Sequence, residues 1–200
     1  MTNNLYISAT GPRSGKTVVA LGVMELLSRK IDKVGFFRPI VQEKYGVNKD
    51  LHLMTACFNL GIPLDQMYGL TTEEATDLAS HGRQEEVFEI IINRYNSLKS
   101  RCDFVVCEGT DSLSTSSDFD FDINAEISKN LSASVLLVAG SQGRTVDETI
   151  QAVETASAAL VKRKCRTIGT IVTRTDGASG WEILDRLSKH HLSETQLLYT

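Results

Sequence analysis

The chain lacks the features that mark several large classes of proteins. Its 200 residues carry a formal net charge of −4 without a block of like charges, which argues against binding to nucleic acid or to a membrane surface. No apolar run approaches the roughly 20 residues that a membrane span needs, and the N-terminus lacks the basic and apolar regions of a secretory signal. We therefore expect a cytoplasmic protein whose partners are small solutes or other proteins.

Motifs for covalent catalysis and for metal binding by soft ligands are also missing. No G-x-S-x-G nucleophile motif occurs, and the tyrosines and the one tryptophan are too scattered to form a platform for stacked bases. We assign no chemistry to the four histidines, which lack metal-ligand spacing with cysteines or acids: His52, His81, His190 and His191. The four cysteines form no C-x-x-C pair and are interpreted as reduced thiols that mostly fill the core: Cys57, Cys102, Cys107 and Cys165.

Short apolar runs alternate with helical patterns along the whole chain. Strands are expected at residues 5–8, 33–37, 103–107, 134–139 and 166–172, and a last one at 195–200. Because the sequence stops at this last strand without a closing segment, we expect it to be truncated or to be one domain of a longer protein. Helices are expected at residues 17–30, 49–58, 71–80, 84–99, 122–130, 145–164 and 179–190, and the polar segment 112–122 is expected to be a loop. This alternation predicts a three-layer α/β fold with a parallel sheet and right-handed crossovers, in a single domain over residues 1–200.

A glycine-containing stretch, ATGPRSGKT, lies between the first expected strand and the first expected helix. Gly15, Lys16 and Thr17 fit the end of the phosphate-loop pattern G-x-x-x-x-G-K-[ST], whereas Thr10 stands where the first glycine belongs. In this context the backbone N–H groups and the helix end face an anion, Lys16 reaches the β- and γ-phosphate oxygens, and Thr17 offers its hydroxyl to magnesium. The alternative is a Gly-Pro turn in which Ser14 caps the helix. The predicted phosphate-binding residues are Thr10, Gly11, Pro12, Arg13, Ser14, Gly15, Lys16, Thr17 and Val18.

Two carboxylates are candidates for a magnesium site beside this loop. Glu108 follows the apolar run FVVC, so it lies at the carboxyl edge of a parallel sheet, where open α/β folds bind ligands. Asp50 opens the helix after the second strand. A solvent-facing acid remains the alternative for Glu108, and a first-turn acid attracted by the helix dipole is the alternative for Asp50. Asp111 could replace either of them.

Five segments occur in an order and at a spacing that resemble a known domain: ISATGPRSGKT, FFRPIV, NKDLHLM, VVCEGTDSL and INAEISKNL. Together they resemble the amino-terminal P-loop domain of bacterial phosphate acetyltransferase, a domain similar to dethiobiotin synthetase. MYGLTTEEA and RCDFVVCEGTD look like the acetyltransferase domain rather than the biotin enzyme. The resemblance implies a P-loop NTPase-like, dethiobiotin-synthetase-like fold, with Mg²⁺ and ATP or another nucleotide as cofactors. It also implies a C-terminal acetyltransferase domain and further copies of the chain, in a homo-oligomer, as partners.

The chain departs from the biotin enzyme at the strand end FRPI. Arg38 stands where that enzyme has a lysine that binds the substrate carbamate, and a planar guanidinium suits phosphate or carboxylate. We expect Arg38 to bind an oxyanion. The alternative is that it pairs with Glu108 or Asp50 across the strand ends and holds an empty site together.

The late loops carry weaker signals for ligand binding. Thr173 stands where the biotin enzyme has an asparagine that reads adenine, and Thr173, Arg174 and Asp176 faintly resemble the T-K-x-D pattern of guanine readers. Base binding is therefore assigned weakly to Thr173 and Arg174, with a plain turn as the alternative. The loop GSQGRT is expected to end in a helix cap at Thr145, and its N–H groups could also contact a ligand.

Three functions fit these observations. The first is a regulatory or assembly domain that binds a nucleotide or another small phosphate-bearing metabolite and adjusts the acetyltransferase activity of a longer enzyme. The second is an ATP-dependent carboligase, against which Arg38 and the single glycine of the turn EGTDS argue. The third is a scaffold that has kept the fold and lost the ligand. We rank them in this order, and the resemblance contributes most of the first rank.

Overall fold

The structure is a computed structural model that describes residues 3–42, 48–110, 117–189 and 196–199. Within these residues, seven strands form one parallel sheet in the order β3-β2-β4-β1-β5-β6-β7. The strands are β1 (Asn4–Ala9), β2 (Val34–Val41), β3 (Tyr68–Thr71), β4 (Phe104–Glu108), β5 (Ser134–Gly140), β6 (Thr167–Thr173) and β7 (Gln196–Tyr199). The helices are α1 (Lys16–Ser28), α2 (Lys49–Cys57), a 3₁₀ turn η1 (Leu64–Gln66), α3 (Thr72–Ser80), α4 (Gln84–Lys99), α5 (Ser117–Asn130), α6 (Val146–Lys162) and α7 (Gly177–Lys189).

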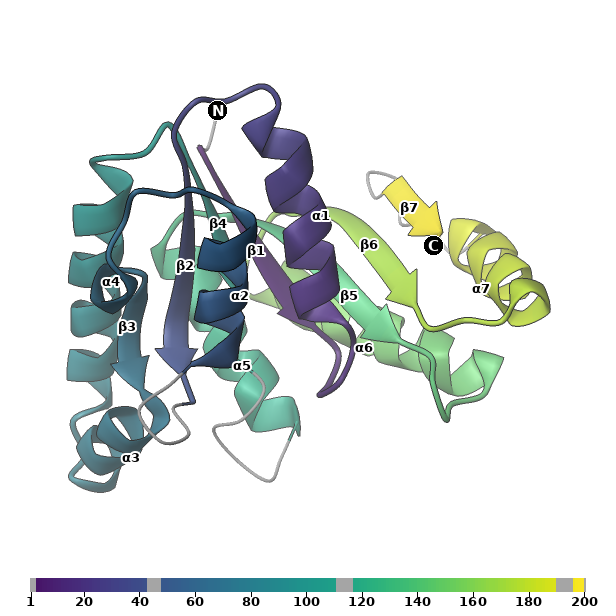
Figure 1. Cartoon of the computed structure of the whole chain (residues 1–200). Helices are drawn as coiled ribbons and strands as arrows, with labels where there is room; N and C mark the ends of the chain where they lie inside the picture. The colour runs from purple at the N-terminus through teal and green to yellow at the C-terminus, as the bar shows by residue number, and fades with distance from the viewer. Residues whose placement is uncertain (1–2, 43–47, 111–116, 190–195, 200) are drawn as a thin grey trace.

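Helices cover both faces of this sheet and form the outer layers of the fold. Helices α1 and α2 lie on one face, and α4, α5 and α6 lie on the other, while all strand arrowheads point to the same edge (Figure 1). The expected three-layer α/β fold is confirmed. None of the helices in the described residues is both long and apolar enough to cross a bilayer.

The strand order creates a switch point beside β1. From β1 the chain runs to β2 and β3 on one side, and after β4 it runs to β5, β6 and β7 on the other side. The loops that follow the neighbouring strands β1 and β4 therefore separate, and ligands of open α/β sheets bind in such a crevice. The fold thus places the loop after β1 and the acid at the end of β4 next to each other.

The central strands are apolar because both of their faces are covered. Every residue of β1 and β2 is buried, and so are the last four residues of β4. Phe37 of β2 packs edge to face on Tyr95 of α4, with ring centroids 5.6 Å apart. Two of the cysteines, Cys107 and Cys165, belong to this core as expected, but Cys57 is exposed and Cys102 is half-buried. The interpretation of the cysteines as mostly core residues is therefore only half right.

Two elements differ from the sequence-based expectations. Strand β3 was not predicted, because it has four residues at the sheet edge and its run YGLT is too short to give a periodic signal. Helix α5 begins at Ser117, so the expected polar loop is wrong from that residue onward. Serine and aspartate suit helix starts as well as loops, since they cap the first turn and oppose the helix dipole. Residues 112–116 of the expected loop lie outside the described residues.

Candidate phosphate-binding site

The loop between β1 and α1 enters the helix through a glycine in a left-handed conformation. Gly15 sits at the helix N-cap position with φ 82°, a left-handed conformation that glycine adopts at little cost. The N–H groups of Val18 and Val19 both donate to the Gly15 carbonyl at 3.1 Å, so the helix is fully formed from its first turn. Ser14 makes no side-chain cap to α1, and the alternative of a Ser14-capped turn is therefore not what the structure has.

The loop is fixed in place by the ends of two later strands. The Thr173 hydroxyl at the end of β6 donates to the Ser14 carbonyl at 2.6 Å, and the Thr10 N–H donates to the Val138 carbonyl of β5 at 3.0 Å. At Gly140 the loop approaches so closely that a Cβ there would lie 3.0 Å from Ser14 Cα. A loop held in this way is preorganised for a ligand, because little order remains to be gained on binding.

Donor groups are buried at the same edge of the sheet. Lys16, the first residue of α1, is only 4% exposed although it carries an ammonium group. Within the part of the chain that the structure describes, Ser14 Oγ and Arg38 Nε are buried and have no hydrogen-bond partner. Buried polar groups without a partner are costly and rare in proteins, so these two donors are unusual features of this edge of the sheet.

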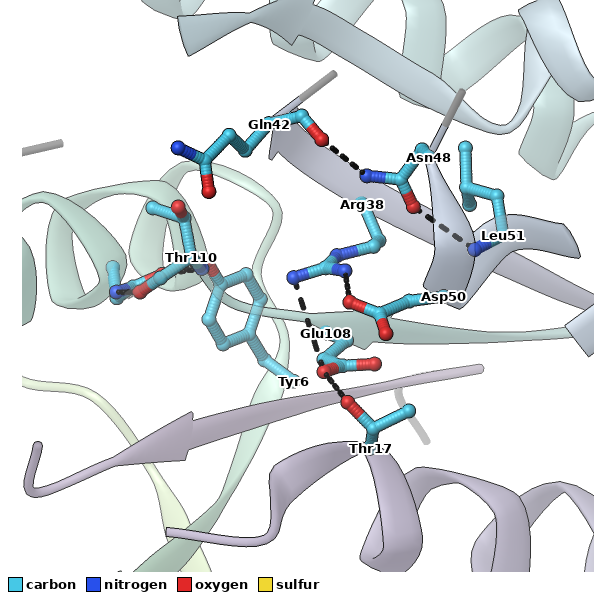
Figure 2. Close-up of polar contacts among 10 residues, drawn as sticks. Tyr6, Thr17, Arg38, Gln42, Asn48, Asp50, Leu51, Glu108 and Thr110 are labelled. Atoms are coloured by element: carbon cyan, nitrogen blue, oxygen red, sulfur yellow. Dashed lines mark hydrogen bonds and ion pairs between the residues drawn. The ribbon is translucent and has the colours of Figure 1, made fainter. Parts of the chain in front are cut away.

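The two predicted acids, Asp50 and Glu108, lie beside the loop and share Arg38 as an ion-pair partner. The Thr17 hydroxyl donates to Glu108 Oε1 at 2.8 Å (Figure 2). Arg38 Nη1 pairs with Asp50 Oδ2, and Arg38 Nη2 lies 3.9 Å from Glu108 Oε1. The register explains this arrangement, because Phe37 of β2 pairs with Cys107 of β4 and the next residues, Arg38 and Glu108, follow at the same level.

Burial and the neighbouring charges act in opposite directions on the pKa of Glu108. Its side chain is 1% exposed, and burial raises the pKa of its carboxyl above the ordinary value. The Arg38 cation, the Thr17 hydrogen bond and the Lys16 charge act in the opposite direction. Glu108 Oε2 is a further buried atom that lacks a partner within the described residues.

Two hydrogen-bonded supports position these acids. Asn48 caps α2 by accepting from the Leu51 N–H at 2.9 Å, and its amide donates to the Gln42 carbonyl at 3.1 Å, which fixes the turn that carries Asp50 (Figure 2). On the other side, Asn124 of α5 holds the backbone that follows Glu108. Its Oδ1 accepts from the Tyr6 hydroxyl at 2.7 Å and from the Thr110 N–H at 3.0 Å, and its amide donates to the Thr110 carbonyl at 2.7 Å.

The outer side of the loop faces a pocket that is rich in arginine. This pocket of about 410 Å³ is lined by Thr10, Gly11, Pro12, Arg13, Ser14, Gly140, Gln142, Arg144 and Arg174. Arg144 Nη1 donates to Thr10 Oγ1 at 3.4 Å, and Arg174 Nη1 donates to Gln142 Oε1 at 2.5 Å. A second pocket of about 530 Å³ continues from it past Asp176 and Ser179. The lining charges of the first pocket are all positive, so it favours an anionic group.

The family of the chain follows from comparison with known proteins. A family model described as "AAA domain" (AAA_26) matches residues 3–196. The chain belongs to this family. The match covers nearly the whole chain, including the loop, both acids and Arg38.

Phosphate acetyltransferases are among the relatives of this AAA-family domain. The phosphate acetyltransferase of Synechocystis sp. is 32% identical over 202 residues, a match that covers 100% of this chain and 29% of the relative. The chain therefore spans less than a third of the length of that relative. The resemblance stated from the sequence motifs is confirmed, and the relative has a large part that this chain does not match.

The comparisons also support the P-loop fold. The ATP-dependent dethiobiotin synthetase BioD of Sulfurovum sp. is 26% identical over 162 residues, which cover 76% of this chain and 75% of the relative. Among solved structures, the apo form of the GTPase PAB0955 from Pyrococcus abyssi superposes with a TM-score of 0.59 at 15% identity, over 96% of this chain and 74% of that chain. At that identity the second likeness shows the fold alone.

The predicted site residues of this AAA-family domain meet at one edge of the sheet, but they do not all point to the ligand position. The Val18 side chain is 72% exposed and its N–H is used within α1. The Thr173 hydroxyl braces the loop, and the Asp176 carboxylate accepts from the Ser179 N–H at 2.8 Å at the start of α7. Arg174 lines the outer pocket, where its contact with a base stays a prediction. Asp111, the alternative metal ligand, lies outside the described residues.

Sequence reasoning missed several residues that build the site. Arg144 belongs to the loop GSQGRT, which we considered from the sequence only for its backbone N–H groups. An arginine shortly after a strand end was the feature that could have identified it as part of the pocket lining. The expected cap at Thr145 is confirmed, because Thr145 and Glu148 form a reciprocal capping box at the start of α6. Tyr6 and Asn124 gave no signal, since they lie far apart in the chain and meet only in the folded protein.

Proposed function

We propose that this chain is a ligand-binding regulatory domain that takes up a nucleotide or another phosphate-bearing metabolite at the loop between β1 and α1. One observation carries the proposal. The braced loop brings together the buried Lys16 and the unpartnered donors Ser14 Oγ and Arg38 Nε at one end of the sheet. An oxyanion satisfies such donors, and a positive helix end adds to its binding.

In the longer relatives, ligand binding to this domain would act on the remainder of the protein. We propose that ligand binding adjusts the acetyl transfer carried out by the rest of a phosphate acetyltransferase, and that contacts between domains or copies of the chain transmit it. The Synechocystis relative supports this proposal by its name and by its greater length. In this proposal the domain itself acts as a binding module, and acetyl transfer belongs to the part of the longer relatives that this chain does not match.

Titration calorimetry with ATP, GTP and inorganic triphosphate tests the proposal. The wild-type chain is expected to bind at least one of them, and Lys16→Ala is expected to abolish that binding, because Lys16 is the buried ammonium of the loop. Lys30→Ala is the matched control, since it removes an exposed charge just beyond the far end of the same helix. Equal binding by wild type and Lys16→Ala would place the ligand elsewhere, and acetyl phosphate formation by the purified chain would contradict a purely binding role.

An ATP-dependent carboligase is the second candidate, and one observation favours it. The match with the Sulfurovum dethiobiotin synthetase spans 75% of that relative's own length. Arg38, in place of the lysine of the biotin enzyme, is engaged with Asp50 and Glu108 rather than directed at a substrate. Formation of dethiobiotin from diaminopelargonate, ATP and carbon dioxide would establish this candidate, and we expect none.

A further inference from the structure

The groups that would hold magnesium in this site are already engaged with cations and donors of the protein. Arg38 lies between the two acids and forms ion pairs with both Asp50 and Glu108 (Figure 2). The oxygen of Glu108 that faces Arg38, Oε1, also accepts the Thr17 hydroxyl at 2.8 Å. Asp50 and Glu108 therefore each face the Arg38 guanidinium, and the Thr17 hydroxyl is engaged with Glu108.

This arrangement does not fit a resident magnesium ion. Mg²⁺ requires near-octahedral oxygen ligands at about 2.0–2.1 Å. Glu108 Oε2 has no partner within the described residues, so an ion bound there and to Asp50 would either lie beside the Arg38 guanidinium or displace it. The Arg38 side chain is 11% exposed and comes from the buried strand β2, so a displaced guanidinium would remain a buried cation beside a second positive ion. Uncompensated buried charge is strongly unfavourable. The fit of these residues favours Arg38 over the metal.

We propose that Arg38 is the resident cation of this site, so that the domain binds its phosphate-bearing ligand without a divalent metal ion. This inference rests on the proposed function. The two acids hold the guanidinium through Nη1 and Nη2, while Nε stays buried without a partner within the described residues. Arg38 thereby places a positive charge between the two acids, where a metal ion would otherwise lie.

The first test uses the metal alone. Mn²⁺ is titrated into the ligand-free chain and followed by electron paramagnetic resonance, with Mg²⁺ as competitor. Wild type is expected to bind no Mn²⁺ at this site, whereas Arg38→Met, which leaves Asp50 and Glu108 unopposed, is expected to bind it. Arg186→Met is the matched control, because Arg186 also bridges two acids, Asp147 at 2.7 Å and Glu182 at 3.4 Å, on the surface. Mn²⁺ binding by wild type that Asp50→Asn removes would overturn the inference.

The second test needs no variant and so does not depend on how Arg38→Met folds. The affinity of wild type for inorganic triphosphate is measured by calorimetry in excess EDTA and in excess Mg²⁺. We expect the two dissociation constants to agree within about threefold, and an affinity more than about tenfold higher with Mg²⁺ would refute the inference.

The two proposals can fail separately. If triphosphate and nucleotides bind in neither buffer, the proposed function fails, and the Mn²⁺ titration still decides whether Arg38 occupies the cation position. If triphosphate binds only with Mg²⁺, the proposed function stands and the role of Arg38 falls.

Discussion

Asn124 joins three backbone and side-chain groups around the end of β4, and its replacement gives a sharp test of how the site is held. It is 3% exposed and comes from α5, on the opposite face of the sheet from the loop helix. Asn124→Ala removes the acceptor used by the Tyr6 hydroxyl and by the Thr110 N–H, and the donor to the Thr110 carbonyl. The substitution therefore takes three hydrogen bonds from buried groups at once.

The expected cost follows from those three bonds. A buried group that loses its partner costs about 1–3 kcal/mol, so three such groups set a range of about 3–9 kcal/mol. Asn124→Ala is expected at the lower end of this range, about 3–5 kcal/mol, because single substitutions exceed that only exceptionally. Tyr6→Phe is the matched control, because it removes one of the three bonds and leaves the backbone of Thr110 paired, and it is expected to cost about 1 kcal/mol.

Urea unfolding with an unchanged slope measures both variants. A loss of less than about 1 kcal/mol for Asn124→Ala would refute the reasoning, since water would then replace these bonds at no cost. An equal loss for Tyr6→Phe would also refute it, because the stability would then depend on the tyrosine rather than on the amide.

Two further predictions address the loops around the site. Thr173→Val keeps the side-chain shape but removes the donor to the Ser14 carbonyl; it is expected to cost about 1 kcal/mol of stability and to weaken triphosphate binding several-fold, whereas Thr173→Ser should bind as wild type does in calorimetry. Glu148 accepts from the Thr145 N–H at 2.7 Å, and this bond lowers the pKa of its carboxyl below the ordinary value. Because the folded-state pKa is depressed, the stabilisation is present above the unfolded-state value of about 4.3 and is lost as the pH falls through the folded-state value. Glu148→Gln should therefore flatten the acid side of the plot of melting temperature against pH, and an unchanged plot would show that the capping box does not contribute.

The alternation of apolar runs and helical patterns was enough to predict most of the fold. The predicted bounds of α4 agree with the structure because its apolar residues repeat at helical spacing over 16 residues. The four-residue strand β3 offers no such repetition, and the start of α5 is polar, so both were beyond pattern reasoning.

The loop and the two acids could also be predicted, since their residues stand next to strand ends in the sequence. The sequence alone could not show that Asp50 and Glu108 pair with Arg38. Arg38 carries a charge that fits either an external oxyanion or the acids of the protein, and only the register between β2 and β4 brings it to Glu108. The Tyr6–Asn124 contact joins residues 118 positions apart, and neither residue stands in a pattern that identifies its partner.

The hydrogen bond from Thr173 to the Ser14 carbonyl also determines when, during folding, the loop after β1 becomes ordered. The loop residues leave the ribosome well before Thr173, yet this residue, 159 positions later in the chain, fixes their backbone. Contacts of such long sequence separation form late, because chain closure must precede them. A nascent or proteolysed chain that ends before β6 would contain the entire phosphate-loop motif and still lack a preorganised loop. We therefore expect ligand affinity at this loop to depend on folding through β6 rather than on the presence of the motif alone.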